Sequence, residues 1–277
     1  MTRLPNFLYV GPDKAGSSWL HEVLLKHPDV YLTPAKDLYF FDRYYDRGLG
    51  WYSSQFREAR DEAVVGEVCQ DYLFHPEAAA RIHETLGPIK VMVSLRDPVE
   101  RAWSSYLYMR KHGLGPDTFG EALRTWPELL EHGRYATGLD RFLDLFPREM
   151  IHVALFDDLR ADPQAFLDGV ADFLDVARLP LAQKDLAARL PAARARSVLL
   201  ASAARRSADW VREHDGATLV GKVKRSSVIQ RTLYRPIDRD AVRPAPDDVI
   251  TVRNALGSEI DSLESTFGLE LRETWGW

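Results

Sequence analysis

The stretch G-P-D-K-A-G-S-S-W near the N-terminus combines glycines, a lysine and two hydroxyls, residue types that together can hold an anion. Gly11 and Gly16 have the spacing of a nucleoside-triphosphate loop, but in that loop a lysine directly follows the second glycine. Here Ser17 follows Gly16, and Lys14 lies inside the loop. These groups suit a tetrahedral oxyanion, and a tight turn with a solvent-exposed lysine is the alternative.

The elements around this stretch would place it at the start of a helix. Residues 7–10 form a short apolar run of β-favouring side chains, which predicts a buried strand. From Ser17 onward, Leu20, Val23 and Leu24 share one helical face. A serine at this boundary can cap the N–H groups of the first turn. We therefore expect a strand, a loop and a helix whose N-terminus attracts negative charge.

A second polar group follows residues 89–95, the most strand-like run in the chain. Arg96 comes at the end of this strand, and Ser104 lies two turns along the helix predicted to run to about Lys111. Ligands of open α/β sheets bind at the carboxyl ends of the strands. Arg96 and Lys14 would then provide two separate anion positions on one sheet edge. The alternative is a surface pair of Arg96 with Asp97 before an ordinary helix.

Strand and helix patterns alternate along the first two thirds of the chain, which predicts an α/β fold with a parallel β-sheet flanked by helices. The further strands are expected at 64–68 and 151–156, and the further helices at 76–86 and 163–174. After about residue 177 strand signals stop, and the C-terminal part should be helical, at 186–212 and 252–267, with an exposed connection over 235–248. We expect one domain over 1–277.

Composition narrows the class of protein. The 277 residues carry a net charge of −5, so the chain as a whole is not built to coat nucleic acid. A single cysteine, Cys69, excludes an intramolecular disulfide and a thiolate zinc site, and the eight histidines show no ligand spacing. No apolar run has the length of a membrane span, and the N-terminus lacks a leader pattern. We expect a cytoplasmic protein with no metal and no membrane partner, and the oligomeric state stays open.

The loop and the segment S-L-R-D-P-V-E-R-A-W-S-S-Y together resemble the sulfotransferases that use 3′-phosphoadenosine 5′-phosphosulfate (PAPS). The match extends more weakly through Gly66-Glu67, Gly133-Arg134-Tyr135 and Phe173-Leu174-Asp175. The resemblance implies a P-loop-like fold, PAPS as the donor and adenosine 3′,5′-bisphosphate (PAP) as its product. It implies that the 5′-phosphosulfate is held by residues of the loop, namely Lys14, Ala15, Gly16, Ser17, Ser18 and Trp19, and the 3′-phosphate by Arg96 and Ser104.

The stretch T-P-A-K-D-L-Y-F-F resembles the K-E-x-H-F-F segment of the carbohydrate-type members, in which the glutamate is the proposed base. Asp37 stands at the glutamate position and Tyr39 at the histidine position. Lys14 would neutralise the leaving nucleotide, and Asp37 would accept the proton of the acceptor. The alternative for Asp37 is a loop carboxylate paired with Lys36 or Arg43. Several carbohydrate-type members also have a lysine where this chain has Val68.

Other side chains are weaker candidates. Asp71 and His75 are reserve bases, with a turn or surface role as the alternative. Four aromatic residues could line an acceptor site, namely Tyr39, Tyr44, Trp51 and Tyr72, whereas Phe40 and Phe41 are expected in the core. Arg194, Arg196 and Ser197 could close over the nucleotide, because the family has a late basic loop; a solvated helix face is the alternative.

The sequence thus predicts a PAPS-dependent sulfotransferase acting on a hydroxyl of a small-molecule or glycoside acceptor. Its Ala- and Arg-rich composition is typical of high-GC bacteria, which favours an acceptor from secondary metabolism. Two rivals are a P-loop kinase or NTPase that binds ATP with Mg²⁺, and a non-catalytic nucleotide-binding protein of the same fold. Asp37, Tyr39 and Val68 depart from the pattern of the carbohydrate-type members, so the non-catalytic alternative stays open.

Overall fold

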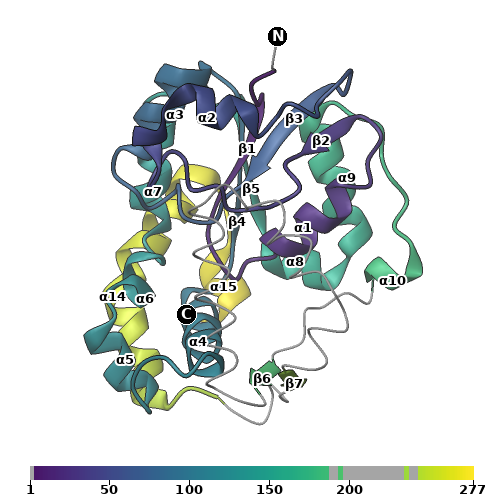
Figure 1. Ribbon diagram of the computed structural model, residues 1–277. Helices are drawn as coiled ribbons and strands as arrows, with labels where there is room; N and C mark the ends of the chain where they lie inside the picture. The colour runs from purple at the N-terminus through teal and green to yellow at the C-terminus, as the bar shows by residue number, and fades with distance from the viewer. Residues whose placement is uncertain (1–2, 187–192, 196–233, 237–242) are drawn as a thin grey trace. The chain divides into compact units, whose positions relative to one another are not determined.

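The computed structural model describes residues 3–186, 193–195, 234–236 and 243–277 (Figure 1). The chain divides into two compact units. The first comprises Met1–Arg96, Arg134–Arg189 and Glu259–Leu269, and the second comprises Asp97–Gly133, Leu190–Ser258 and Glu270–Trp277. The single domain expected over 1–277 stays a prediction.

The first unit contains a five-stranded parallel sheet in the order β2-β3-β1-β4-β5. Its strands are β1 (Phe7–Gly11), β2 (Val30–Leu32), β3 (Val64–Val68), β4 (Lys90–Leu95) and β5 (Ile151–Leu155). Strand β1 lies at the centre, where Phe7 pairs with Gly66 of β3 and with Lys90 of β4. Continuous burial of β1 and β3 fits a sheet covered on both faces. The predicted α/β class is confirmed, and the three-residue β2 is a strand that the sequence pattern missed.

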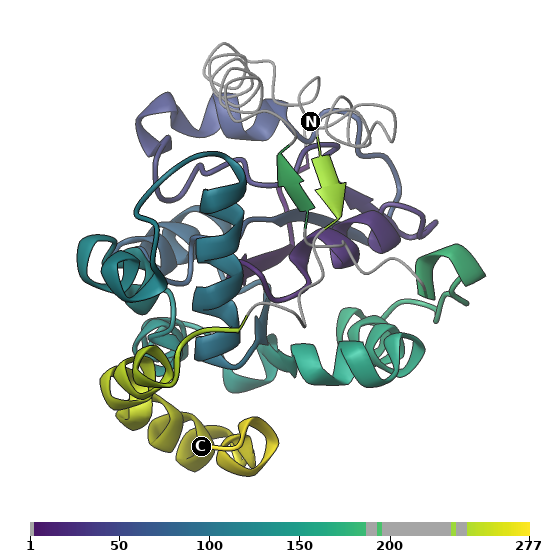
Figure 2. The same cartoon turned by 90° about the horizontal axis from the view of Figure 1, so that it is seen from below.

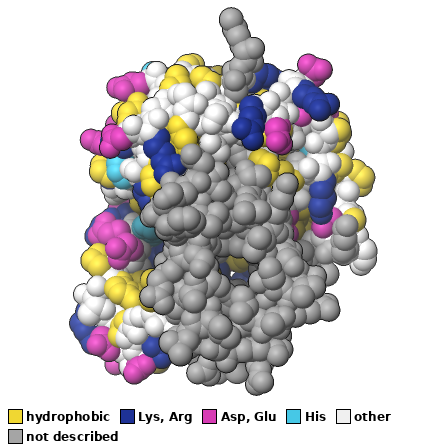
Figure 3. Space-filling view, in the orientation of Figure 1, with side chains coloured by type: hydrophobic (Ala, Val, Ile, Leu, Met, Phe, Trp, Pro, Cys, Tyr) yellow, Lys and Arg dark blue, Asp and Glu magenta, His cyan; other side chains and the backbone are white. Residues whose placement is uncertain are grey.

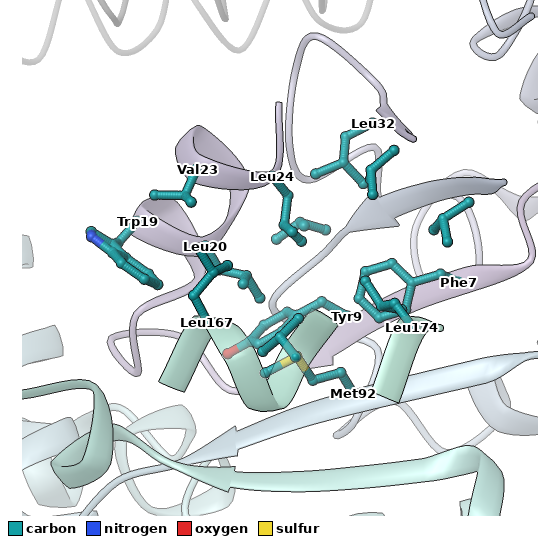
Figure 4. Close-up of a cluster of buried hydrophobic side chains, with 14 of the residues drawn as sticks. Phe7, Tyr9, Trp19, Leu20, Val23, Leu24, Leu32, Met92, Leu167 and Leu174 are labelled. Atoms are coloured by element: carbon teal, nitrogen blue, oxygen red, sulfur yellow. The ribbon is translucent and has the colours of Figure 1, made fainter. Parts of the chain in front are cut away.

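Helices cover both faces of this sheet (Figure 1). On one side lie α1 (Ser17–Leu24), α8 (Phe156–Ala161) and α9 (Pro163–Leu174), and on the other lie α3 (Ala78–Leu86) and α7 (Tyr135–Leu143). Figure 4 shows the core under the first group, where Trp19, Leu20 and Leu24 of α1 meet Leu167 and Leu174 of α9 over the sheet. Burial of this apolar face fixes the angle at which α1 leaves the loop.

Short elements complete the first unit. They are a 3₁₀ turn at Tyr45–Arg47, α2 (Gly48–Ser54), a second 3₁₀ turn at Arg148–Met150 and α10 (Gln183–Leu186). Helix α3 begins at Ala78, two residues after the predicted start at Pro76, and β5 ends at Leu155 because Phe156 opens α8.

The second unit is mainly helical. It contains α4 (Pro98–Lys111), α5 (Phe119–Thr125), α6 (Glu128–Glu131), α15 (Leu271–Trp275) and the part of α14 (Pro246–Phe267) up to Ser258. Its core joins Val99, Ala102 and Tyr106 of α4 with Phe119 of α5 and Leu256 of α14.

Two expectations for the C-terminal part were wrong. Strands β6 (Ala193–Ala195) and β7 (Tyr234–Pro236) form the antiparallel pair shown in Figure 2, with Arg194 opposite Arg235. Each strand is too short to give a sequence pattern of its own. Its pairing partner also lies far along the chain, so the pair has no local sequence signal. Helix α14 begins at Pro246, inside the predicted connection, because proline at the first position and acidic residues in the first turn favour a helix start.

The described residues on one face of the molecule carry mixed charge. Figure 3 shows basic and acidic side chains interspersed over the described residues of that face. Among the helices of the described chain, none combines the length and apolar character that crossing a membrane requires.

Candidate functional site

The loop between β1 and α1 has a backbone that requires glycine at both ends. Gly16 has a φ of 94°, and a Cβ there would lie 2.6 Å from Cδ2 of Leu159. Gly11 has a φ of 140°, and its Cβ would lie 2.7 Å from the backbone oxygen of Gln70. Lys14 also has a positive φ of 62°. The loop is therefore a tight, specified turn, and its glycines serve both conformation and close packing.

The first turn of α1 does not have the serine cap that the sequence predicted. Gly16 occupies the N-cap position in the left-handed conformation, and no side chain caps the helix. Ser17 and Ser18 instead lie within the first turn, with Ser17 buried. The N–H groups in the first turn of any helix point toward the preceding loop, and without a side-chain cap they can hold an anion.

The carboxyl end of β4 anchors the loop. Nη1 of Arg96 donates to the backbone oxygen of Lys14 at 2.9 Å, and Oγ of Ser94 donates to that of Ala15 at 2.8 Å. Arg96 is 8% exposed, and its guanidinium lies 4.8 Å from the ring centre of Phe156. The hydroxyl of Tyr135 donates to the backbone oxygen of Arg96 at 2.9 Å. The structure thus brings Arg96 and the Lys14 loop together at one sheet edge.

Ser104, the partner expected for Arg96, belongs to α4 of the second unit and is half-buried. Asp97 starts that helix, since its carboxylate accepts from Val99 N at 2.9 Å and from Nε1 of Trp277 at 3.2 Å. Burial raises the pKa of Asp97 to about 6. This cap holds the start of the helix that carries Ser104.

Asp37 is fixed beside β3 by its own backbone and side chain. Its N–H donates to the backbone oxygen of Val68 at 2.8 Å, and its Oδ1 accepts from Gln70 N at 3.3 Å. Nζ of Lys36 lies 3.4 Å from Asp37 Oδ2 and donates to Ser17 Oγ at 3.0 Å. The pairing of Asp37 with Lys36 that the sequence offered as an alternative is therefore present. The same ammonium also links Asp37 to the first residue of α1.

Glu67, wholly buried on β3, holds the segment that follows Asp37. Its Oε1 accepts from the hydroxyl of Tyr72 at 2.8 Å and from Leu38 N at 3.2 Å, and its Oε2 accepts from the hydroxyl of Tyr52 at 2.9 Å. The Tyr72 oxygen in turn accepts from Phe40 N at 2.9 Å. Burial raises the pKa of Glu67 to about 8, although these hydrogen bonds lower it. A network of polar groups thus fixes the backbone on the carboxyl-terminal side of Asp37.

Tyr39 is buried, with a positive φ of 56°. The Arg43 guanidinium lies 4.1 Å from its ring centre, and Nε2 of Gln70 donates to its hydroxyl oxygen at 3.5 Å. Burial, and next the carboxylate of Asp37, raise the pKa of the phenol well above its usual value. Tyr39 therefore stays protonated and can act as a donor but not as a base.

The reserve bases have other partners. Asp71 forms an ion pair with Nη2 of Arg43, and Nδ1 of His75 accepts from Glu77 N at 3.3 Å. Asp37 contacts the Lys36 ammonium, which reaches Ser17 at the start of α1.

The remaining predicted side chains fall into three groups. Tyr44 and Trp51 are half-buried, and the Arg47 guanidinium lies 4.8 Å from each ring centre. Tyr72 and Trp19 are buried, and Nε1 of Trp19 donates to the backbone oxygen of Asp185 at 3.0 Å. Arg194 lies in β6, whereas Arg196 and Ser197 lie outside the described residues.

Phe40 and Phe41 are 1% and 0% exposed, so their predicted place in the core is confirmed. Acceptor contacts of the other aromatic residues stay a prediction. In the described part of the chain, no group of three or more His, Cys, Asp or Glu side chains is arranged to hold a metal ion.

Two side chains that contact the predicted site residues were not predicted from the sequence. Lys36 was visible in the A-K-D-L-Y segment, but its contact with Ser17 joins residues 19 positions apart. Glu67 was noted only as part of a weak match, and its three donors come from separate places in the chain. No local pattern signals such a network.

Comparison with known proteins agrees with this geometry. The sulfotransferase domain, as a family, matches residues 4–188, which is more than half of the chain. The chain therefore belongs to the sulfotransferase family of transferases, and the resemblance seen in the sequence is confirmed.

Individual relatives are similar over part of their length. Mouse heparan sulfate glucosamine 3-O-sulfotransferase 6 is 35% identical over 192 residues, covering 64% of this chain and 54% of that protein. The chain thus spans about half the length of the curated relatives it matches first.

Among solved structures, a sulfotransferase from Alicyclobacillus acidocaldarius has a TM-score of 0.60 at 25% identity, covering 83% of this chain and 99% of that chain. A mouse sulfotransferase complexed with PAP has a TM-score of 0.54 at 10% identity, covering 99% and 89%, a likeness that shows the fold alone.

Proposed function

We propose that this chain transfers the sulfuryl group of PAPS to a hydroxyl of a small-molecule or glycoside acceptor, with Asp37 as the base. One observation carries the proposal: the Lys36 ammonium contacts both Ser17 Oγ and Asp37 Oδ2. A carboxylate thus lies next to the start of α1, where an anion would be held. In-line transfer needs that juxtaposition of base and anion site.

The residues present fit the 5′ end of PAPS. The α1 N-terminus has no side-chain cap, and Gly16 occupies the N-cap position in the left-handed conformation. Lys14 and Lys36 supply positive charge, and Ser17 and Ser18 supply hydroxyl donors. This donor set suits a phosphosulfate group, which is anionic and rich in acceptor oxygens.

When bound, PAPS supplies an activated sulfuryl group. The N–H groups of α1 and the Lys14 ammonium would stabilise the charge that develops on the departing phosphate. Asp37 would accept the proton of the attacking hydroxyl. Arg96, which anchors the loop, would contribute to holding the 3′-phosphate.

A sugar hydroxyl is the acceptor class that the relatives favour, because the matched mouse protein is named for transfer to the 3-O position of a glucosamine. The chain covers only part of that relative, so a bacterial secondary metabolite remains the more specific hypothesis drawn from composition. Tyr44, Trp51 and Arg47 would contribute ring faces and a charge suited to a glycoside or an aromatic acceptor.

Calorimetric titration of the purified chain with PAP in the absence of metal, and with ATP and Mg²⁺ in parallel, tests the cofactor. We expect metal-independent binding of PAP that Lys14→Ala weakens by about tenfold or more. The control Lys90→Ala removes an ion-paired lysine at the start of β4 and should leave PAP binding unchanged. Binding of ATP with Mg²⁺ but not of PAP would overturn the proposal in favour of a kinase or NTPase.

The assignment of the base has its own test. Asp37→Asn should leave PAP affinity within about threefold of wild type and lower turnover of an identified acceptor by about 10²-fold or more. A non-catalytic binding protein would bind PAP normally and turn over no acceptor with either residue at position 37. Wild-type turnover in Asp37→Asn would assign the base elsewhere.

A further inference from the structure

Lys36 lies between two groups that the proposed reaction needs. Its Nζ donates to Ser17 Oγ at 3.0 Å and lies 3.4 Å from Asp37 Oδ2. The Lys36 side chain is only 21% exposed. The neighbouring structure therefore covers its aliphatic stem and holds the ammonium at the start of α1, rather than leaving it extended in solvent.

Backbone pairing explains how Lys36 reaches this place. The N–H of Asp37 donates to the backbone oxygen of Val68, which pairs in register with Tyr9 of β1. Residues 36 and 37 thus run beside the carboxyl end of β3, next to the strand from which the loop departs. Val68 itself is apolar and fully buried. At this place the positive charge comes from the Lys36 side chain and not from residue 68.

We infer that Lys36 is a second cation for the 5′-phosphosulfate, in addition to Lys14. The inference rests on the proposed function. An anion held by the α1 N-terminus and the Ser17 hydroxyl lies next to the ammonium that this hydroxyl already contacts. A shift of that ammonium from Asp37 to the anion stabilises negative charge on the leaving group. The same shift leaves the Asp37 carboxylate unpaired to receive the acceptor proton.

A simpler reading makes Lys36 only a partner that neutralises Asp37. The two interpretations differ in whether Lys36 itself contributes to affinity for the 5′-phosphate of the nucleotide. A phosphosulfate-binding lysine contributes to the 5′-phosphate and not to the rest of the nucleotide. A partner of Asp37 changes affinity for the 5′-phosphate only by neutralising the Asp37 carboxylate, so its effect disappears when residue 37 is asparagine.

The test measures affinity for two probes, PAP and adenosine 3′-monophosphate, which lacks the 5′-phosphate. Lys36→Met keeps the covered stem and removes the charge, and Lys36→Gln is a second variant should the first fold poorly. We expect either variant to lower PAP affinity about tenfold, while affinity for the monophosphate changes by less than about twofold. Lys90→Ala is the matched control, because its ammonium is also ion-paired and similarly exposed, at 27%.

The outcomes separate this inference from the proposed function. Equal discrimination between the two probes in wild type and Lys36→Met overturns the inference and leaves the proposed function intact. A wild-type chain that does not prefer PAP over the monophosphate overturns both. In the Asp37→Asn background, Lys36→Met should still lower PAP affinity. Loss of its effect there would show that Lys36 acts only through Asp37.

Discussion

Replacement of Glu67 by alanine should destabilise the chain severely. The carboxyl group is wholly buried and accepts hydrogen bonds from Tyr72, Tyr52 and Leu38 N. Alanine leaves all three donors without this partner, and each buried donor that loses its acceptor lowers the free energy of unfolding by about 1–3 kcal/mol. Alanine also removes a carboxyl group whose burial costs free energy, which offsets part of the loss in the free energy of unfolding. We expect Glu67→Ala to lower the free energy of unfolding by about 3–5 kcal/mol.

Urea denaturation at pH 6, followed by far-UV circular dichroism, measures this change. Glu67→Gln is the matched variant, since its side-chain oxygen can accept from Tyr72 and Leu38 N while its amide donates to the Tyr52 oxygen. It should cost about 1 kcal/mol or less. Tyr52→Phe, which removes one donor and no carbon, should cost about 1–2 kcal/mol. A loss below about 1 kcal/mol for Glu67→Ala would refute the view that Glu67 organises this segment.

Three further predictions concern stability. Burial raises the pKa of Glu67 from 4.5 to about 8, so between these two pH values the unfolded chain loses this proton while the folded chain keeps it. The free energy of unfolding of wild type, relative to that of Glu67→Gln, should therefore fall by about 1.4 kcal/mol per pH unit as pH rises through this window. A rise with pH would contradict the assignment. Gly16→Ala should cost about 1–3 kcal/mol more in urea than Gly87→Ala, since both have positive φ but only the first Cβ would meet Leu159; equal losses would argue against the clash. Asp97→Ala removes the cap of α4 and should lower the thermal midpoint by an amount equivalent to about 1–2 kcal/mol, whereas an unchanged midpoint would show the cap to be dispensable.

Local sequence patterns predicted the elements that carry the loop. The apolar run before Gly11 and the helical face from Leu20 to Leu24 needed no distant partner to be recognised, and the structure has β1 and α1 there. Proline and aspartate after Arg96 likewise predicted the start of α4. In these places residue type, spacing and chain order all favour the same local structure.

What the sequence did not predict depends on contacts between distant residues. Strand β2 has three residues and becomes a strand only because Val30 pairs with Val64 of β3. The serine cap was wrong because Gly16, with its left-handed backbone, takes the cap position. The contacts of Lys36 and Glu67 arise when β3 brings the 36–41 segment alongside, and hydrophobic periodicity carries no information about them.

Hydrogen–deuterium exchange of the chain with and without PAP tests most directly whether the loop at the α1 N-terminus holds the nucleotide. Binding there predicts slower exchange in peptides that cover residues 12–20, in wild type and in Lys90→Ala, and less slowing in Lys14→Ala at the same subsaturating PAP concentration. Protection confined to other segments, or unchanged exchange in residues 12–20 at saturating PAP, would contradict it.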